Sequence, residues 1–186
     1  MTRARALLVF LLLPVSSLGA ELLSIEVDYE HGTYTLNSEV WFDATVEQVY
    51  EVFRRWDNSA EFSSVIVESR DVAPDEFGRA RFYVRNRVCI LFFCWSFERH
   101  GYVEFERNQR LLAFADPATS DFHLSDERWQ FVARDGGTVV TYDWQMKPKF
   151  WIPPGIGPYV IKRKLERDGG SAIDRIEAIA QRVGDD

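Results

Sequence analysis

Three histidines, His31, His100 and His123, are the side chains of this chain best suited to proton transfer or metal binding near neutral pH. They lie far apart in the sequence, and their spacing matches no zinc motif. The sequence also lacks a G-x-S-x-G elbow, a phosphate-binding loop and a dinucleotide fingerprint. An acid–base pair assembled in space, such as His123 with Asp121 or Asp143, stays open. We therefore expect no metal and no cofactor, and we leave open whether the chain catalyses a reaction.

The two cysteines, Cys89 and Cys94, offer a different chemistry. Two thiols without a nearby histidine make a poor metal site. If the chain reverses at Leu91 and Phe92, the cysteines face each other on neighbouring strands at a Cα separation of about 4.5–5.5 Å, which permits a disulfide. Such a small ring would stabilise the fold by only about 2 kcal/mol, and it would mainly fix the hairpin. We predict this disulfide for an exported protein.

The tip of the expected hairpin, Ile90-Leu91-Phe92-Phe93, is apolar at every position, whereas turns favour Gly, Asn, Asp and Pro. One hypothesis is that the tip is exposed and contacts a membrane or a partner protein. The alternative is an ordinary buried strand, with the reversal elsewhere in the chain.

The same register sorts the flanking residues between two faces. It places Arg85 opposite Glu98, so the arginines of this stretch are expected on a solvated face with cross-strand ion pairs. The opposite, mainly apolar face carries Phe82, Asn86, Trp95, Phe97 and Arg99. Polar groups on such a face are unfavourable unless they are paired. Asn86 and Arg99 therefore pair with each other, pair with an acidic residue of a neighbouring strand, or contact the polar end of a ligand.

Aromatic residues make up 15% of the chain, which is more than a core of this size requires. Two later stretches place them on one face of a strand, Trp129 with Phe131 and Tyr142 with Trp144. These residues would line an apolar ligand pocket beneath a helix, and core packing explains them equally well.

The elements that position these residues follow from the periodicity. Residues 31–44 alternate as a strand, and Thr45-Val46-Glu47-Gln48 matches a capping box at the start of a helix of about ten residues. One further helical turn is expected at 59–62. From 65 to 148 the period is two, interrupted by turn residues, which predicts five or six antiparallel strands.

A long helix is expected at residues 156–183, after Pro153 and Pro154. Gly169 and Gly170 lie in its middle, where two glycines cost about 2 kcal/mol relative to alanine. They indicate either a kink or close packing on the sheet, or clearance for a ligand beneath the helix.

The chain begins with a basic segment, a short apolar run at 6–13 and small residues up to Ala20, which is the layout of a secretory signal peptide. The apolar run is too short to span a bilayer. We expect 1–20 to be the signal peptide and 21–186 to be a single domain. The alternative is an uncleaved anchor, because Leu18 is a poor residue at the third position before a cut after Ala20.

The net charge and the leader limit which compartment and which partners we expect for the protein. Without the two leader arginines, the 22 basic residues become 20 against 29 acidic ones, a net charge of −9. This balance argues against nucleic acid as a partner. The short leader favours export to a bacterial periplasm.

Several segments carry a resemblance to a known superfamily. They are Ala44-Thr45-Val46-Glu47-Gln48-Val49-Tyr50-Glu51-Val52-Phe53, Trp56-Asp57, Glu61-Phe62, Val67-Glu68-Ser69-Arg70 and Pro148-Lys149-Phe150-Trp151-Ile152-Pro153-Pro154. With the order of elements, they resemble the START-like helix-grip (SRPBCC) superfamily, in particular its polyketide cyclase and coenzyme Q-binding branch. The resemblance implies an α+β helix-grip fold, with a curved antiparallel sheet of six to seven strands around a long C-terminal helix. It also implies a cavity for a hydrophobic molecule.

Together these observations predict an exported binding or carrier protein for a lipid, quinone or polyketide-like molecule. One alternative is a polyketide cyclase/dehydrase-like enzyme, and a second is a membrane- or protein-interaction module that uses the apolar tip at 90–93. The expected ligand-binding residues are Phe82, Asn86, Trp95, Phe97, Arg99, Trp129, Phe131, Tyr142 and Trp144.

Overall fold

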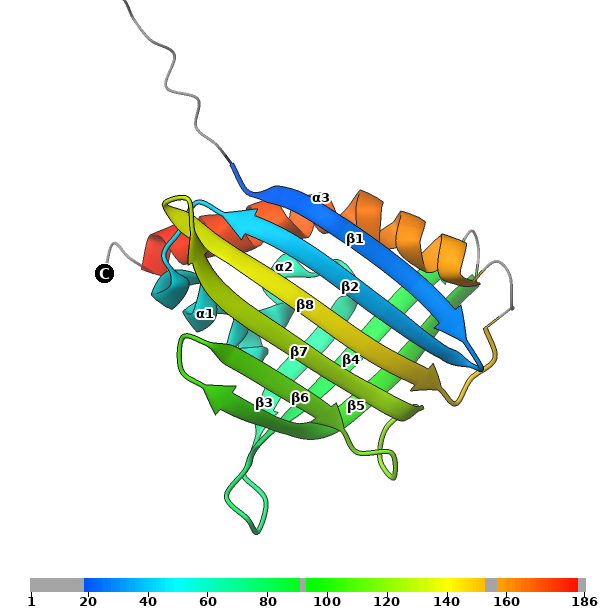
Figure 1. Cartoon of the computed structure of the whole chain (residues 1–186). Helices are drawn as coiled ribbons and strands as arrows, with labels where there is room; N and C mark the ends of the chain where they lie inside the picture. Colours follow the sequence, from blue (N-terminus) through cyan, green and yellow to red (C-terminus); the bar gives the residue numbers. More distant parts are fainter. Residues whose placement is uncertain (1–18, 91–92, 153–156, 184–186) are drawn as a thin grey trace, which may run out of the picture.

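The computed structural model describes residues 19–90, 93–152 and 157–183. The elements are β1 (Glu21–Glu30), β2 (Thr33–Phe42), α1 (Val46–Phe53), η1 (Trp56–Asn58), α2 (Ser59–Phe62), β3 (Ile66–Val72), β4 (Ala80–Ile90), β5 (Phe93–Glu106), β6 (Arg110–Ala115), β7 (Phe122–Arg134), β8 (Gly137–Pro148) and α3 (Gly157–Val183). The chain is α+β, with an antiparallel sheet and a long C-terminal helix, as the sequence predicts (Figure 1).

In the described part of the chain the strands form a sheet of eight in the order β1-β2-β8-β7-β6-β5-β4-β3, with antiparallel neighbours. The sequence predicts six to seven strands, and the additional one is β1. A bulge between Leu22 and Ser24 breaks its alternation, so its half-buried residues Leu22, Ile25 and Val27 do not follow a period of two. This irregularity explains why periodicity alone misses the strand.

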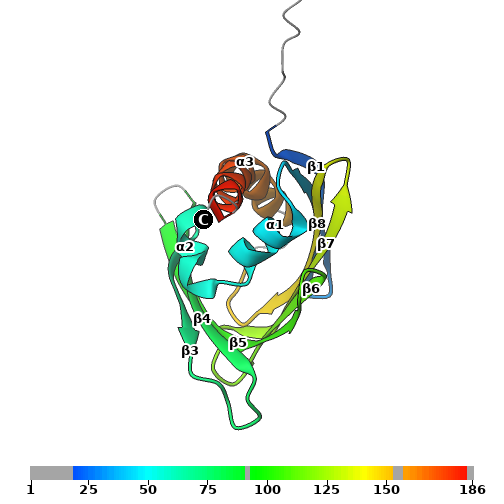
Figure 2. The same cartoon turned by 90° about the vertical axis from the view of Figure 1, so that its left-hand side faces the viewer.

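The sheet curves around α3, and α1 and α2 lie beside the second half of that helix (Figure 2). The capping box of α1 is confirmed: the Gln48 N–H donates to Thr45 Oγ1 at 3.3 Å, and the Thr45 N–H donates to Gln48 Oε1 at 2.8 Å. The predicted helical turn at 59–62 is α2. Among the described residues, no helix is both long enough and apolar enough to cross a membrane.

The β4–β5 hairpin has the predicted register and disulfide. Cys89 lies opposite Cys94 and is bonded to it. Ile90 pairs with Phe93, so the chain reverses at this point and not elsewhere. Leu91 and Phe92 lie outside the described residues, as do the side chains of Ile90 and Phe93, so contact of the tip with a membrane stays a prediction.

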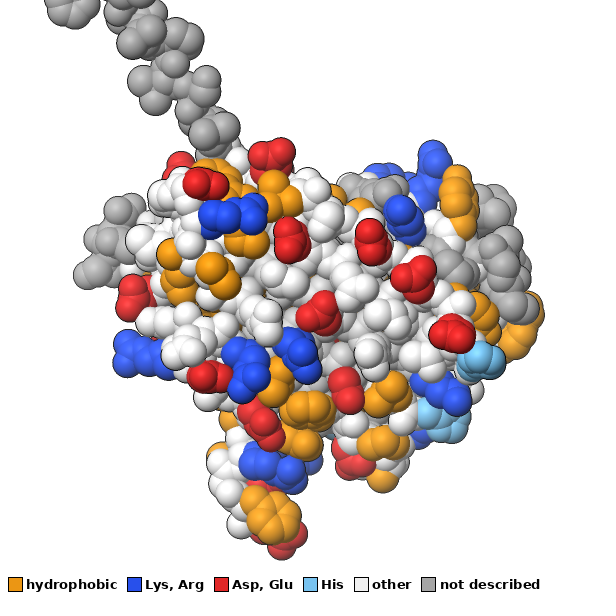
Figure 3. Space-filling model, in the orientation of Figure 1, with side chains coloured by type: hydrophobic (Ala, Val, Ile, Leu, Met, Phe, Trp, Pro, Cys, Tyr) orange, Lys and Arg blue, Asp and Glu red, His pale blue; other side chains and the backbone are white. Residues whose placement is uncertain are grey.

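The outer face of this hairpin is charged, but its ion pairs differ from those predicted. Arg85 faces Glu98 in the register, yet it pairs with Glu68 of β3 at 3.0 Å. Glu98 instead accepts a hydrogen bond from the Tyr83 hydroxyl at 3.0 Å. Acidic and basic side chains are interspersed over the side of the molecule seen in Figure 3.

The described residues form two apolar clusters in the interior. The larger one includes Phe42, Val49 and Trp56, and it packs against Ile173 and Ile176 in the second half of α3. The smaller one consists of Tyr34, Phe122 and Met146, with Phe97, Trp144, Phe150, Ile152 and Ile161 packed against them. Since Ile161 belongs to the first half of α3, each half of the helix covers its own cluster.

Helix α3 continues through Gly169 and Gly170. No heavy atom of the described residues, apart from the adjacent helix itself, lies within 4 Å of the position that a Cβ would take at either glycine. Close packing on the sheet therefore does not explain the two glycines. Clearance beneath the helix stays open as their role.

Candidate ligand-binding site

Arg99 and Glu127 form an ion pair inside the molecule, between the sheet and α3. Arg99 comes from the middle of β5 and Glu127 from β7, and their side chains are only 8% and 5% exposed. The sequence left open a pairing of Arg99 with an acidic residue of a neighbouring strand; the partner is acidic, but it lies on β7, which β6 separates from β5. Burying two charges is costly unless they compensate each other closely. This pair is therefore the principal polar feature that a molecule in the interior would meet.

Three further side chains extend the pair into a network across β5, β7 and β8. The Tyr142 hydroxyl donates to Glu127 Oε2 at 2.8 Å. Ser125 Oγ accepts a hydrogen bond from Trp144 Nε1 at 3.0 Å and another from Arg99 Nη1 at 3.5 Å. The Arg99 guanidinium carbon also lies 5.5 Å from the centre of the Trp144 ring. Two of the expected ligand-binding residues, Tyr142 and Trp144, thus orient a third, Arg99.

The electrostatics of this network follow from its burial. Loss of water raises the pKa of Tyr142 well above its usual value, so its hydroxyl keeps its proton and acts as a donor. The same loss of water lowers the pKa of Arg99, although a guanidinium starts so high that it stays charged at neutral pH. Within the described part of the chain, Arg99 Nε has no hydrogen-bond partner. A charged donor therefore remains available in the interior.

Asn86 adds a second buried polar group. It lies on β4 and is 5% exposed. Val84 lies directly opposite Arg99 in the register, and Asn86 is two residues further along the same face of β4. Asn86 and Arg99 are therefore diagonal neighbours, a position in which two residues lie about 7–8 Å apart. Arg99 and Asn86 therefore present polar atoms from adjacent strands toward the same interior.

The expected aromatic residues divide between the two clusters. Phe82 stacks on Trp56 at 4.3 Å between ring centres, Trp129 stacks on Tyr142 at 4.9 Å, and Phe131 belongs to the same larger cluster. Phe97 belongs to the smaller cluster. Trp95 is 49% exposed near the end of the hairpin, so it lies at the rim of the interior.

The space beneath the first half of α3 is narrow. A crevice there is lined by Tyr34, Leu36, Trp144, Met146 and Ile161, among others, and has no room for a molecule the size of water. A separate, open hollow of about 410 Å³ lies outside the sheet interior, between α1 and the end of β5. A ligand in this crevice would therefore require the first half of α3 to move outward.

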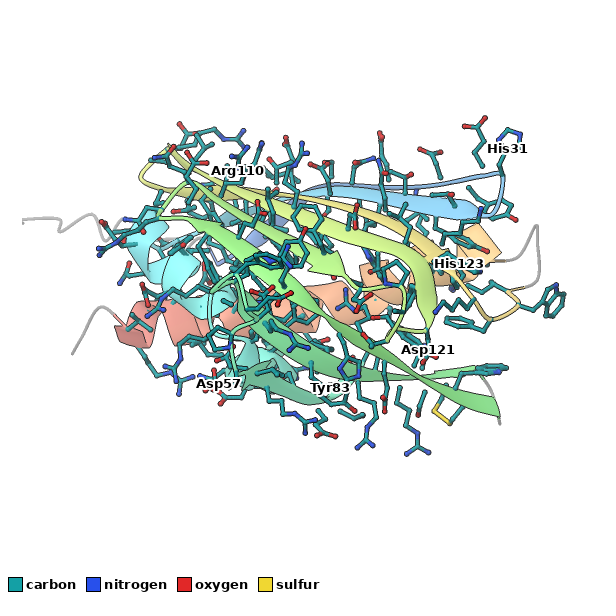
Figure 4. The ribbon with its side chains drawn as sticks, turned by 90° about the horizontal axis from the view of Figure 1, so that it is seen from below. His31, Asp57, Tyr83, Arg110, Asp121 and His123 are labelled. Atoms are coloured by element: carbon teal, nitrogen blue, oxygen red, sulfur yellow. A yellow bond between two sulfur atoms is a disulfide. The ribbon has the colours of Figure 1, made fainter. Side chains whose placement is uncertain are left out.

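The histidines considered for catalysis are not assembled into such a site. His31 lies in the turn between β1 and β2, whereas His123 belongs to β7 and is exposed near Asp121 (Figure 4). The Asp121 carboxylate accepts the Glu98 backbone N–H at 2.8 Å, and Asp143 faces Arg128 in the register. Among residues 19–90, 93–152 and 157–183, no group of three or more His, Cys, Asp and Glu could hold a metal ion.

No protein-family model matches the sequence, and no curated protein matches it. Solved structures do resemble it. A START superfamily protein from Mycobacterium smegmatis has a TM-score of 0.59 at 15% identity, covering 80% of this chain and 98% of that one. A STAR-related lipid transfer protein fragment from Xanthomonas axonopodis has a TM-score of 0.61 at 14% identity, covering 88% and 99%. The chain has the START-like helix-grip fold. The Zhui aromatase/cyclase from Streptomyces sp. R1128 shares it, with a TM-score of 0.56 at 13% identity, covering 81% and 94%.

The fold places two polar residues beside Arg99 that the sequence analysis did not predict, Glu127 and Ser125. Both belong to β7, on the face that carries Trp129 and Phe131. Extending the alternation of that strand backwards by two and four residues would have identified them. What periodicity does not give is the pairing with Arg99, because that contact joins strands separated by β6.

Proposed function

We propose that this chain is an exported binding or carrier protein for a hydrophobic small molecule, such as a lipid, a quinone or a polyketide-like compound, held between the sheet and α3. One observation carries the proposal: the apolar interior contains a buried polar network whose Arg99 Nε has no hydrogen-bond partner among the described residues. Buried donors are rarely left unsatisfied in native proteins. An oxygen of a bound ligand would satisfy this one.

The surroundings of Arg99 favour a mostly apolar ligand with one polar end. Asn86 offers an amide beside the guanidinium, whereas Phe82, Phe97 and Trp129 offer aromatic walls. A ligand pocket with predominantly apolar walls and a few fixed polar groups is the usual arrangement for small molecules. The names of the structural neighbours, a lipid transfer protein and an aromatase/cyclase, support the same class of ligand.

The proposal also covers how the ligand enters the interior and where the protein is located. Trp151 and Tyr159 are 79% and 61% exposed beside the start of α3, and Trp95 is half exposed. Aromatic rings are favoured at membrane surfaces, so the hairpin tip at 90–93 and these rings would contact a membrane while the first half of α3 opens. The Cys89–Cys94 disulfide supports export to an oxidising compartment, for which the periplasm is our choice.

A cyclase/dehydrase-like enzyme is the less favoured alternative. Such an enzyme needs an acid or base beside a bound substrate. His123 is exposed, and Asp121 already binds the Glu98 backbone N–H. His123 and Asp121 are both exposed, so this pair does not line the interior.

The proposal is tested by native mass spectrometry and organic extraction of the protein purified from its own exported compartment. We expect one lipid-like molecule per chain, and a lower occupancy in Asn86→Leu. Arg87→Leu is the matched control, because Arg87 is the next residue on β4 and is exposed. Reproducibly empty protein, or equal losses in both variants, would contradict the proposal.

Membrane contact has its own test. A dansyl group or spin label at position 92 should become shielded from water when vesicles are added. A label that stays fully solvent-exposed would remove the hairpin tip from the proposal and leave the carrier function untouched.

A further inference from the structure

Glu177 is a buried carboxylate in the second half of α3. It is 9% exposed, and no basic side chain pairs with it among the described residues. Its two oxygens accept backbone hydrogen bonds, from the Ala20 N–H to Oε2 at 2.9 Å and from the Asp43 N–H to Oε1 at 2.8 Å. A buried negative charge is unfavourable without a compensating positive one. The Glu177 carboxylate is therefore placed to form an ion pair, but no described basic side chain supplies the positive charge.

Ala20 is also where the leader meets the folded domain. It immediately precedes β1, which begins at Glu21. A cut after Ala20 would leave Leu18 at the third position before it, which is a poor residue there. A cut after Gly19 places Ser17 at that third position and Gly19 at the first, so both are small as a leader peptidase requires.

We propose that export cleaves the chain between Gly19 and Ala20, one residue before the boundary expected from the sequence, and that the new α-ammonium of Ala20 pairs with Glu177. The inference rests on the proposed export. Hydrolysis of the Gly19–Ala20 peptide bond consumes one water, leaves a carboxylate on Gly19 of the released leader, and gives Ala20 an amine that takes up a proton. The α-amino group of a chain has an ordinary pKa of about 7.7–8.0, so most of it is cationic at neutral pH.

The nitrogen of Ala20 is already placed for this pair. At 2.9 Å from Glu177 Oε2, it is within the range of a charge-assisted hydrogen bond, and no rearrangement of the backbone is needed. The pair joins β1 to α3, while the Asp43 N–H and the Gln181 side chain join α3 to the segment before α1 at 2.8 and 3.1 Å. Cleavage would thus complete an anchor that holds the second half of α3 on the sheet.

The cleavage site is tested by N-terminal sequencing and intact mass of the exported protein. We expect a chain that begins at Ala20. A chain that begins at Glu21 would overturn the inference and leave export intact, whereas a retained leader in the exported compartment would overturn the cleavage altogether. Ligand extraction from the same sample tests the carrier function separately, so the two failures are distinguishable.

The ion pair is tested on chains released from an N-terminal fusion, beginning at Ala20, at acetylated Ala20 or at Glu21, each with Glu177 or with Glu177→Gln. In the Glu177 chains, acetylation or loss of Ala20 should lower the melting temperature by several degrees. In the Glu177→Gln chains, acetylation should change it little, because no carboxylate remains to be neutralised. Equal effects of acetylation in both backgrounds would overturn the pair.

Discussion

Arg99 and Glu127 keep opposite charges in a part of the molecule from which water is largely excluded. Each charge is tolerated because the other is beside it, and the Tyr142 and Ser125 hydroxyls complete part of their hydrogen bonding. A pair of this kind gives little net stability compared with apolar residues of the same size. The proposed ligand would give the pair a role in binding, beyond its small contribution to stability.

This interpretation predicts a specific pattern of stabilities. Arg99→Met leaves the Glu127 charge buried and unpaired, and it should lower the free energy of unfolding by about 3–5 kcal/mol. Combining it with Glu127→Gln removes that charge and keeps an acceptor for Tyr142, so the double variant should regain much of the loss. Urea unfolding measures both. A double variant no more stable than Arg99→Met would contradict a charge-based account.

Tyr142 should make the stability of the folded protein decrease at alkaline pH. Because burial raises its pKa above the unfolded value of about 10, the tyrosine stays protonated in the folded state at pH values where it ionises in the unfolded state. The unfolded state then binds fewer protons, so stability is fully present below pH 10 and falls as the pH rises above it. In Tyr142→Phe this fall should be shallower. Unfolding curves between pH 8 and 11 compare the two, and identical slopes would exclude Tyr142 as a source.

At the scale of elements, the two glycines of α3 stand between its anchored second half and its first half. Replacing both Gly169 and Gly170 by alanine should stabilise the protein by about 2 kcal/mol, since no described neighbour obstructs a Cβ at either position. If α3 bends there to admit ligand, the same change should slow ligand uptake. Thermal unfolding and the uptake rate of a fluorescent fatty acid measure the two effects. Greater stability with unchanged uptake would place the opening elsewhere.

The elements also differ in how far the sequence predicts them. The β4–β5 register and the Cys89–Cys94 disulfide could be predicted because a tight reversal leaves few possible strand pairings. The start of α1 could be predicted because the capping box involves only neighbouring residues. Strand β1 was missed because its bulge disrupts the alternation. An acidic partner for Arg99 was one alternative among several, and Glu127 itself was not predicted, since this contact depends on the order in which β5, β6 and β7 lie in the sheet.

At the scale of the whole molecule, the fold divides into a fixed part and a part that must open. The fixed part is the larger cluster, where Ile173, Ile176 and Ala180 of α3 are buried and Glu177 binds the backbone before β1 and α1. The other part is the smaller cluster, where Ile161 is half-buried whereas Tyr159, Lys162 and Arg163 are exposed. A ligand that entered the crevice beneath the first half of α3 would disturb the second of these parts.

Hydrogen exchange can detect this division. Local opening needs less free energy where fewer apolar groups are buried, so amides at the start of α3 should exchange faster than those of 173–183. Ligand should protect the first set, because it fills the space that their opening exposes, and it should leave the second set nearly unchanged. Glu177→Gln provides the converse control, since it should speed exchange at 173–183 by removing an anchor of that half. Uniform exchange along α3, or equal protection of both halves by ligand, would mean that the helix opens as a single unit and that the two glycines do not divide it.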